Sequence, residues 1–203
     1  MEVIVDNLIE KALQDAVSYK QYRADLDNLV EEVKSGNSDS NAPYLEYRLL
    51  NQQRMKRLDK NFKLSQTVLR KLKEVEDPLV WLVLIENWCG DGAQSLPILN
   101  KMAEASPNIS LKIVLRDQHL PLMDQFLTDG GRSIPKLIML DEQTGAIKDT
   151  WGPRPTKATV MFNEHKSKYG KITPEFRTEL QRWYAKDKGI NVVRDILKML
   201  ALE

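Results

Sequence analysis

The segment LVWLVLIENWCGDGAQSLPIL (79–99) joins an unbroken apolar run to a helix-like pattern through a cysteine. Its first part, LVWLVLIEN (79–87), is short and rich in Val, Leu and Ile, which predicts a buried central strand rather than a helix. A second apolar run, SLKIVLRD (110–117), follows DGAQSLPILNKMAEAS (91–106), which has the length of a helix. Strand, helix and strand in this order predict a right-handed parallel crossover.

The rest of the chain after this crossover predicts a hairpin and closing helices. A short helix is expected in LPLMDQFLTDGG (120–131). The runs KLIMLDEQTG (136–145) and AIKDTW (146–151) are joined by turn-forming residues, which predicts an antiparallel hairpin and therefore a mixed sheet. From residue 156 to 202, helical patterns alternate with Gly and Pro breakers and predict two or three closing helices.

Residues 1–75 are predicted to form a helical extension. Apolar residues recur at helical spacing through the first 33 positions, which indicates one long helix or two joined ones. The segment SGNSDSNAP (35–43) consists of turn formers and is predicted to be a linker or loop. Two more amphipathic helices are expected in 44–58 and 64–75. The predicted second domain, 76–203, then contains the sheet and the closing C-terminal helices.

The composition of the 203-residue chain argues against several functional classes. One cysteine cannot form an intramolecular disulfide, and the two histidines, His119 and His165, supply no zinc-ligand spacing. The first residues are acidic where a secretory signal is basic, and no apolar run approaches the roughly 18 residues of a membrane span, so a cytoplasmic protein is expected. A formal net charge of +1 gives no overall field that attracts nucleic acid or an anionic membrane.

Two blocks of opposite charge occupy the helical extension. Residues 1–40 carry four basic and nine acidic side chains, whereas residues 43–75 carry nine basic and three acidic ones. Charge blocks usually mark solvated surfaces, so the favoured interpretation is two helical faces of opposite sign that pack together. The alternative interpretation is a basic face that docks an acidic partner.

Cys89 is the candidate reactive residue. It lies in WCGDG (88–92), where the first strand of the crossover gives way to its helix, and active sites of open α/β sheets lie at such strand ends. The helix dipole and the free N–H groups of a helix N-terminus favour thiolate. Asp91 opposes thiolate formation by a similar amount, so the sequence leaves the thiol pKa open. Asp91 has a second interpretation as the N-cap of the helix.

The stretch WCGDGAQSLPIL resembles the active-site motif of the thioredoxin family, in which Trp-Cys-Gly-Pro-Cys begins a helix that a proline later interrupts. The matching positions are Trp88, Cys89, Gly90 and Pro97. Ser133-Ile134-Pro135, just before the hairpin, resembles the family's loop in which a cis-proline packs beside the cysteine. Two separated matches in the right order strengthen each other.

This resemblance covers residues 77–152 and implies an α/β fold. The expected architecture is a thioredoxin-like three-layer fold with a mixed central sheet, plus the N-terminal helical extension and the C-terminal helices. The segments IENWCGD (85–91) and WGPRP (151–155) further resemble a bacterial thioredoxin-like subgroup that carries a helical front extension.

The chain departs from the family motif at its second cysteine. Gly92 stands at the resolving position, Asp91 replaces the intervening proline, and Val83 stands where many thioredoxins carry a buried acid. A thioredoxin attacks with one thiol and expels product with the second. This chain therefore cannot be a self-sufficient dithiol reductase.

The resemblance implies two groups of site residues. The catalytic group consists of the nucleophile Cys89 with Trp88, Gly90, Asp91 and Pro135. The substrate-binding group consists of Arg132, Ser133 and Ile134. In this group Arg132 is a candidate for holding an anion such as a glutathione carboxylate, and the backbone beside Pro135 is a candidate for pairing with an extended peptide.

Two functional hypotheses follow. In the first, the protein is a monothiol oxidoreductase: Cys89 attacks a protein disulfide or sulfenic acid, and an external thiol such as glutathione resolves the mixed disulfide. No metal or other cofactor is expected. A variant comes from the weak resemblance of Cys89-Gly90-Asp91-Gly92 to the Cys-Gly-Phe-Ser of monothiol glutaredoxins, which bridge an iron–sulfur cluster with glutathione and a second subunit. In the second hypothesis, the protein is a non-catalytic binding module that keeps the fold and the peptide groove.

Overall fold

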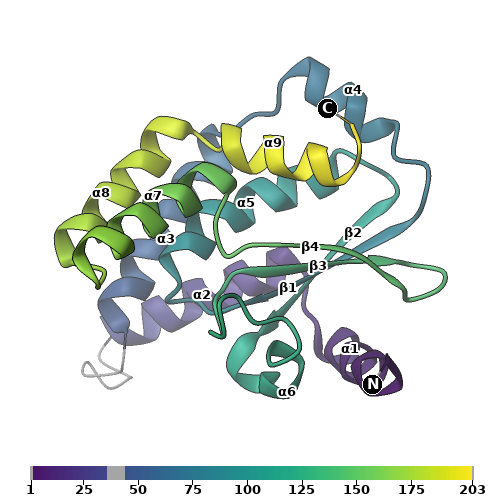
Figure 1. The fold of residues 1–203 in the computed structure, drawn as a ribbon, viewed down its shortest axis with the longest axis horizontal. Coiled ribbons are helices and arrows are strands. Elements are labelled where there is room, and N and C mark those ends of the chain that lie inside the picture. Colours follow the sequence, from purple (N-terminus) through teal and green to yellow (C-terminus); the bar gives the residue numbers. More distant parts are fainter. Residues whose placement is uncertain (1, 36–43, 203) are drawn as a thin grey trace.

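The computed structural model describes residues 2–35 and 44–202, and its helices cover both faces of a four-stranded sheet (Figure 1). The strands are β1 (Leu79–Ile85), β2 (Ile109–Leu115), β3 (Lys136–Asp141) and β4 (Ile147–Trp151). The helices are α1 (Glu2–Asp15), α2 (Tyr19–Lys34), α3 (Leu45–Asn61), α4 (Gln66–Lys73), α5 (Gly90–Glu104), the 3-10 turn η1 (Arg116–Gln118), α6 (Leu120–Met123), α7 (Thr156–Tyr169), α8 (Pro174–Asp187) and α9 (Ile190–Met199).

The sheet has the strand order β2-β1-β3-β4. β1 is parallel to β2 and antiparallel to β3, and β3 is antiparallel to β4. The predicted crossover, hairpin and mixed sheet are therefore confirmed, as is the thioredoxin-like fold class. In Figure 1, α5 and α9 lie on one side of the sheet, and α1 and α6 lie on the other. Every residue of β1 is buried because both of its faces are covered, which explains its unbroken apolar sequence.

The front helices are two rather than one, because the chain leaves the helix between α1 and α2. There Val17 pairs with Ile113 on the edge of β2, through N–H···O bonds of 2.9 and 3.0 Å. Ser18 then caps α2, its hydroxyl accepting a hydrogen bond from the Gln21 N–H. The break thus covers part of the free edge of β2, where an unpaired strand invites association.

The helical extension contributes to the same hydrophobic core as the sheet. Ile9, Tyr22 and Met55 are buried in one cluster with the apolar residues of β1 and α5. α2 ends at Lys34, and most of the predicted linker, 36–43, lies outside the described residues. The division of the chain at residue 76 stays a prediction.

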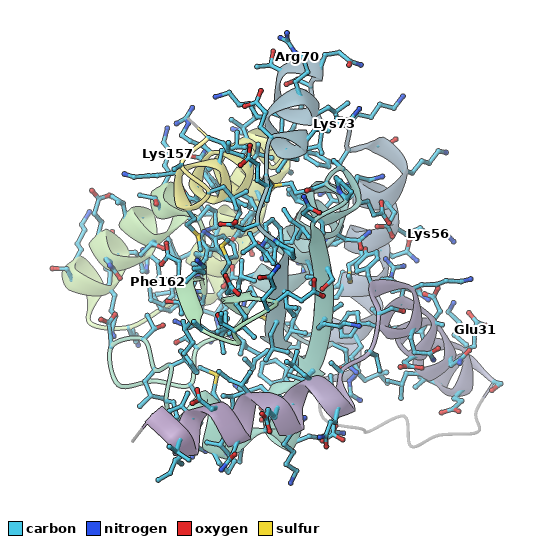
Figure 2. All side chains as sticks on the ribbon, turned by 90° about the vertical axis from the view of Figure 1, so that its right-hand side faces the viewer. Glu31, Lys56, Arg70, Lys73, Lys157 and Phe162 are labelled. Carbon is cyan, nitrogen blue, oxygen red and sulfur yellow. The ribbon has the colours of Figure 1, made fainter. Side chains whose placement is uncertain are left out.

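The two charge blocks meet where α2 packs against α3. Their closest ion pair, at 2.6 Å, joins Arg23, a basic residue of the acidic block, to Asp59, an acidic residue of the basic block. Some of the majority charges project into solvent, as Figure 2 shows for Lys56 on α3 and for Arg70 and Lys73 on α4. None of the described helices is long and apolar enough to cross a membrane.

Three closing helices follow the hairpin, the larger number that the sequence allowed. α7 and α8 pack around a small separate core of Ala158, Phe176, Leu180 and Tyr184. α9 packs against α5 and contributes Val192, Ile196 and Leu197 to the main core. This arrangement brings α8 to the N-terminal end of α5, where Cys89 lies.

Candidate functional site

Cys89 is itself the N-cap of α5. Its backbone is extended (φ −74°, ψ 112°), and its Sγ accepts a hydrogen bond from the Gly92 N–H at 3.3 Å. The interpretation of Asp91 as the N-cap is therefore wrong, because Asp91 lies within the first turn of the helix. The thiol takes the place that an Asp or Ser side chain usually fills, so the helix dipole and one free N–H act directly on sulfur.

The second predicted loop lies against the thiol. The Cys89 Sγ–H donates to the carbonyl oxygen of Ile134 at 3.3 Å, and the Ile134–Pro135 peptide bond is cis. Gly152, at the exit of β4, packs against this loop: a Cβ atom there would lie 2.1 Å from the carbonyl oxygen of Pro135, and its φ of +112° is one that side chains disfavour. Glycine at position 152 thus lets the hairpin close over the loop.

Asp91 forms a buried ion pair beside the thiol. Its carboxylate Oδ2 lies 2.8 Å from the Arg154 Nε, and its Oδ1 accepts a hydrogen bond from the Tyr184 hydroxyl at 3.0 Å. The Arg154 guanidinium in turn lies 3.9 Å from the centre of the Phe162 ring, a cation–π contact. Figure 2 labels Phe162 on α7. The sequence alone does not point to Arg154 or Tyr184 as site residues, although Arg154 lies in the WGPRP segment.

Burial sets the electrostatics of the site. The pKa of Cys89 is raised to about 12, first by burial of the thiol and second by the charge of Asp91. The N–H groups of Gly92 and Asp91 and the charge of Arg154 act in the opposite direction. Burial also raises the pKa of Asp91, against the lowering effects of Arg154 and Tyr184. From the sequence alone, only the helix dipole and an exposed carboxylate can be weighed, and their effects on the thiol pKa are of similar size. Desolvation, which only the structure shows, decides that the thiol pKa is raised.

Gly92, at the position of the missing resolving cysteine, packs closely against Ile85. A Cβ atom on Gly92 would lie 2.5 Å from the Cδ1 of Ile85 and 2.9 Å from its Cγ1. Gly90 is less restricted, since a Cβ there would first meet the Gln181 amide at 3.1 Å. The Ile85 side chain at the end of β1 would therefore have to shift to admit any side chain at position 92.

Trp88 is half-buried and contacts the helical extension. Its ring stacks on Tyr44 with a centroid distance of 4.8 Å, and the Arg116 guanidinium lies 5.1 Å from its centre. The neighbouring Asn87 is fixed from α3: the Arg48 Nε donates to its side-chain oxygen at 2.8 Å. The extension is thus part of the wall of the site.

Arg132 is paired with an acidic side chain. It is exposed, and its guanidinium donates two hydrogen bonds to the carboxylate of Asp124, at 2.6 and 2.8 Å. An external anion would have to compete with this carboxylate, so anion binding by Arg132 stays a prediction. Ser133, between Arg132 and the loop, is half-buried. Across residues 2–35 and 44–202, no three His, Cys, Asp or Glu side chains gather to form a metal site.

Comparisons with known proteins agree with this geometry. A family model described as Thioredoxin matches residues 37–168. Among solved structures, the chain is similar to PA1234, a protein of unknown function from Pseudomonas aeruginosa, with 23% identity and a TM-score of 0.56 over 75% of this chain and 83% of that one. It is also similar to an HIV epitope-scaffold, with 20% identity and a TM-score of 0.55 over 91% and 98% of the two chains. Both likenesses show the fold alone. A search of curated proteins found no match.

Proposed function

Because the chain belongs to the thioredoxin family, we propose that it acts as a monothiol thiol–disulfide redox protein through Cys89. One observation carries the proposal: the Cys89 Sγ caps α5 and contacts the Ile134 carbonyl beside cis-Pro135. In this family that is the attacking position. Gly92 leaves the motif without a resolving thiol, so the second half of the reaction belongs to another molecule.

The reaction proceeds in two exchanges. The Cys89 thiolate attacks one sulfur of a protein or peptide disulfide; that S–S bond breaks, a mixed disulfide forms, and the other sulfur leaves as a thiolate that takes a proton. A small external thiol, such as glutathione, then attacks the substrate sulfur of the mixed disulfide. Cys89 leaves as thiolate and regains its proton, and the substrate sulfur remains bonded to the external thiol. The backbone of Ser133 and Ile134 pairs with an extended substrate segment.

The raised pKa slows both exchanges, because little of the Cys89 thiol is ionised for attack and because a strongly basic thiolate is a poor leaving group. With a pKa of about 12, roughly one thiol in 10⁵ is ionised at pH 7. The rare thiolate is more nucleophilic because it is more basic, which recovers part of this loss. Burial of Cys89, at 7% exposure, is the main cause of the shift, so a substrate that opens the site would speed its own reaction.

Incubation with oxidised glutathione, followed by intact-mass measurement, tests the proposal. The folded wild-type protein is expected to gain one glutathione over hours, faster at pH 9 than at pH 7, and the Cys89→Ser variant none. The same incubation in urea gives the rate of the uncovered thiol. A wild-type protein that gains no adduct at pH 9 while folded, yet reacts in urea, would contradict the proposal.

A second candidate function is a non-catalytic binding module. It is favoured by the burial of the thiol and by apolar side chains exposed on the extension, namely Tyr44, Tyr47 and Leu50, which are 54%, 43% and 51% exposed. The first of these, Tyr44, stacks on Trp88. For this function, Cys89→Ser is expected to leave partner binding intact and Tyr47→Ser to weaken it. A redox function predicts instead that Cys89→Ser abolishes disulfide-exchange activity.

A further inference from the structure

We propose that a groove formed by α3, α4, α8 and α9 binds a small amphipathic anion, a molecule with one apolar chain and one carboxylate. The groove has a volume of about 630 Å³. This lies within the range of roughly 300–1,000 Å³ that small-molecule sites occupy. Cys89 is not among its lining residues, so the inference does not depend on the proposed redox function.

The walls of the groove are largely apolar. They include Phe62, Leu64 and Val68 from the α3–α4 region, with Ile190 and Val193 from α9. Ile190 is 57% exposed, an unusual degree for an isoleucine that faces a concave surface. This surface offers carbon contacts to an aliphatic chain.

Two polar residues in the lining already have partners. The Ser65 hydroxyl accepts the Val68 N–H as the cap of α4, and the Tyr184 hydroxyl donates to Asp91. Neither hydroxyl therefore needs a polar ligand.

The charge of the groove selects the sign of the ligand. Three exposed basic residues lie in its lining: Arg57, Lys63 and Lys188. Of the groove-lining residues, all within the described part of the chain, none is Asp or Glu. Basic groups beside an apolar wall complement an aliphatic carboxylate, whereas an aliphatic ammonium meets repulsion.

Calorimetric titration of the full chain with decanoate, below its micelle concentration, tests the inference. Saturable one-to-one binding is expected, with decyltrimethylammonium, which has the same chain length and the opposite charge, at least about tenfold weaker. The double variant Arg57→Gln/Lys63→Gln should bind decanoate about threefold to tenfold more weakly. Lys56→Gln is the matched control, because Lys56 projects away from the body in Figure 2.

The apolar wall is tested by Ile190→Glu, which places a carboxylate in the groove. This variant should lose decanoate binding, while Val160→Glu should keep it: Val160, on α7, is 50% exposed and does not line the groove. Circular dichroism checks that both variants fold, and amide chemical shifts of the wild type should change around the groove on titration.

Three results would overturn the proposal. One is equal affinity for decanoate and decyltrimethylammonium, and another is unchanged decanoate binding by folded Ile190→Glu. The third is a wild-type dimer in sedimentation that Ile190→Glu dissociates, which would assign the groove to a second copy of the chain.

Discussion

Replacing Asp91 by Asn should make Cys89 more reactive. The charge of Asp91 is the second cause, after burial, that raises the thiol pKa. The amide of Asn is nearly isosteric with the carboxylate and can keep the hydrogen bond from the Tyr184 hydroxyl. The change therefore removes a negative charge beside the sulfur while it leaves the positive charge of Arg154 in place.

The size of the effect follows from the separation of the two groups. At a separation of about 6 Å and an effective dielectric constant of about 20, two unit charges interact by ~2.8 kcal/mol. This energy corresponds to about two pKa units, which is an upper bound. For a fall of about one to two units, the thiolate fraction rises about 10- to 100-fold. The lower nucleophilicity of a less basic thiolate reduces the gain in rate to roughly three- to tenfold.

The assay is the rate of alkylation by iodoacetamide between pH 7 and 10, followed by intact mass. Asp149→Asn is the matched control, since Asp149 lies exposed on β4, and its rate should equal that of the wild type. Rates in low urea concentrations separate a lower pKa from local opening, because opening increases with urea. An unchanged or slower rate in folded Asp91→Asn would refute the electrostatic argument.

Three further predictions concern the same site. The wild-type alkylation rate should rise about tenfold per pH unit up to pH 10 without a plateau, since the thiol pKa is about 12; a plateau below pH 9 would disprove the raised pKa. Arg154→Gln leaves Asp91 buried without its cation and should lower the free energy of unfolding by about 3–5 kcal/mol in urea denaturation; a loss under about 1 kcal/mol would contradict this. Gly92→Cys alone should form no disulfide with Cys89 under mild oxidation, whereas Gly92→Cys with Ile85→Ala should form one, which free-thiol counting detects.

Much of the fold could be predicted because local pattern and burial agree. β1 is covered on both faces, and a strand buried in this way needs apolar residues at every position, which is the pattern seen in its sequence. The break between α1 and α2 does not follow from local pattern. It is fixed by the pairing of Val17 with Ile113, a contact between distant segments that no helical periodicity records.

In the candidate site, too, the residues in local motifs could be predicted and the contacts made by tertiary packing could not. Cys89 and Pro135 could be identified because each lies in a short motif at a predictable place in the order of strands and helices. The role of Asp91 could not, because its partners Arg154 and Tyr184 come from the loop after β4 and from α8. An aspartate near a helix start predicts a cap, and only tertiary packing turns this one into a buried ion pair.

The chemistry of Cys89 thus depends more on its burial than on its sequence motif. Ile85 packs against position 92, so a cysteine introduced there would require the Ile85 side chain to move. Burial is also the largest cause of the raised thiol pKa, and it exceeds the stabilisation by the helix N-terminus. Two motif residues beside Cys89 are held by parts of the chain outside the motif: Trp88 stacks on Tyr44 of the extension, and Asp91 contacts Arg154 and the Tyr184 hydroxyl of α8. Because burial raises the thiol pKa, a substrate that displaces these side chains would lower that pKa and so control the reactivity of the thiol.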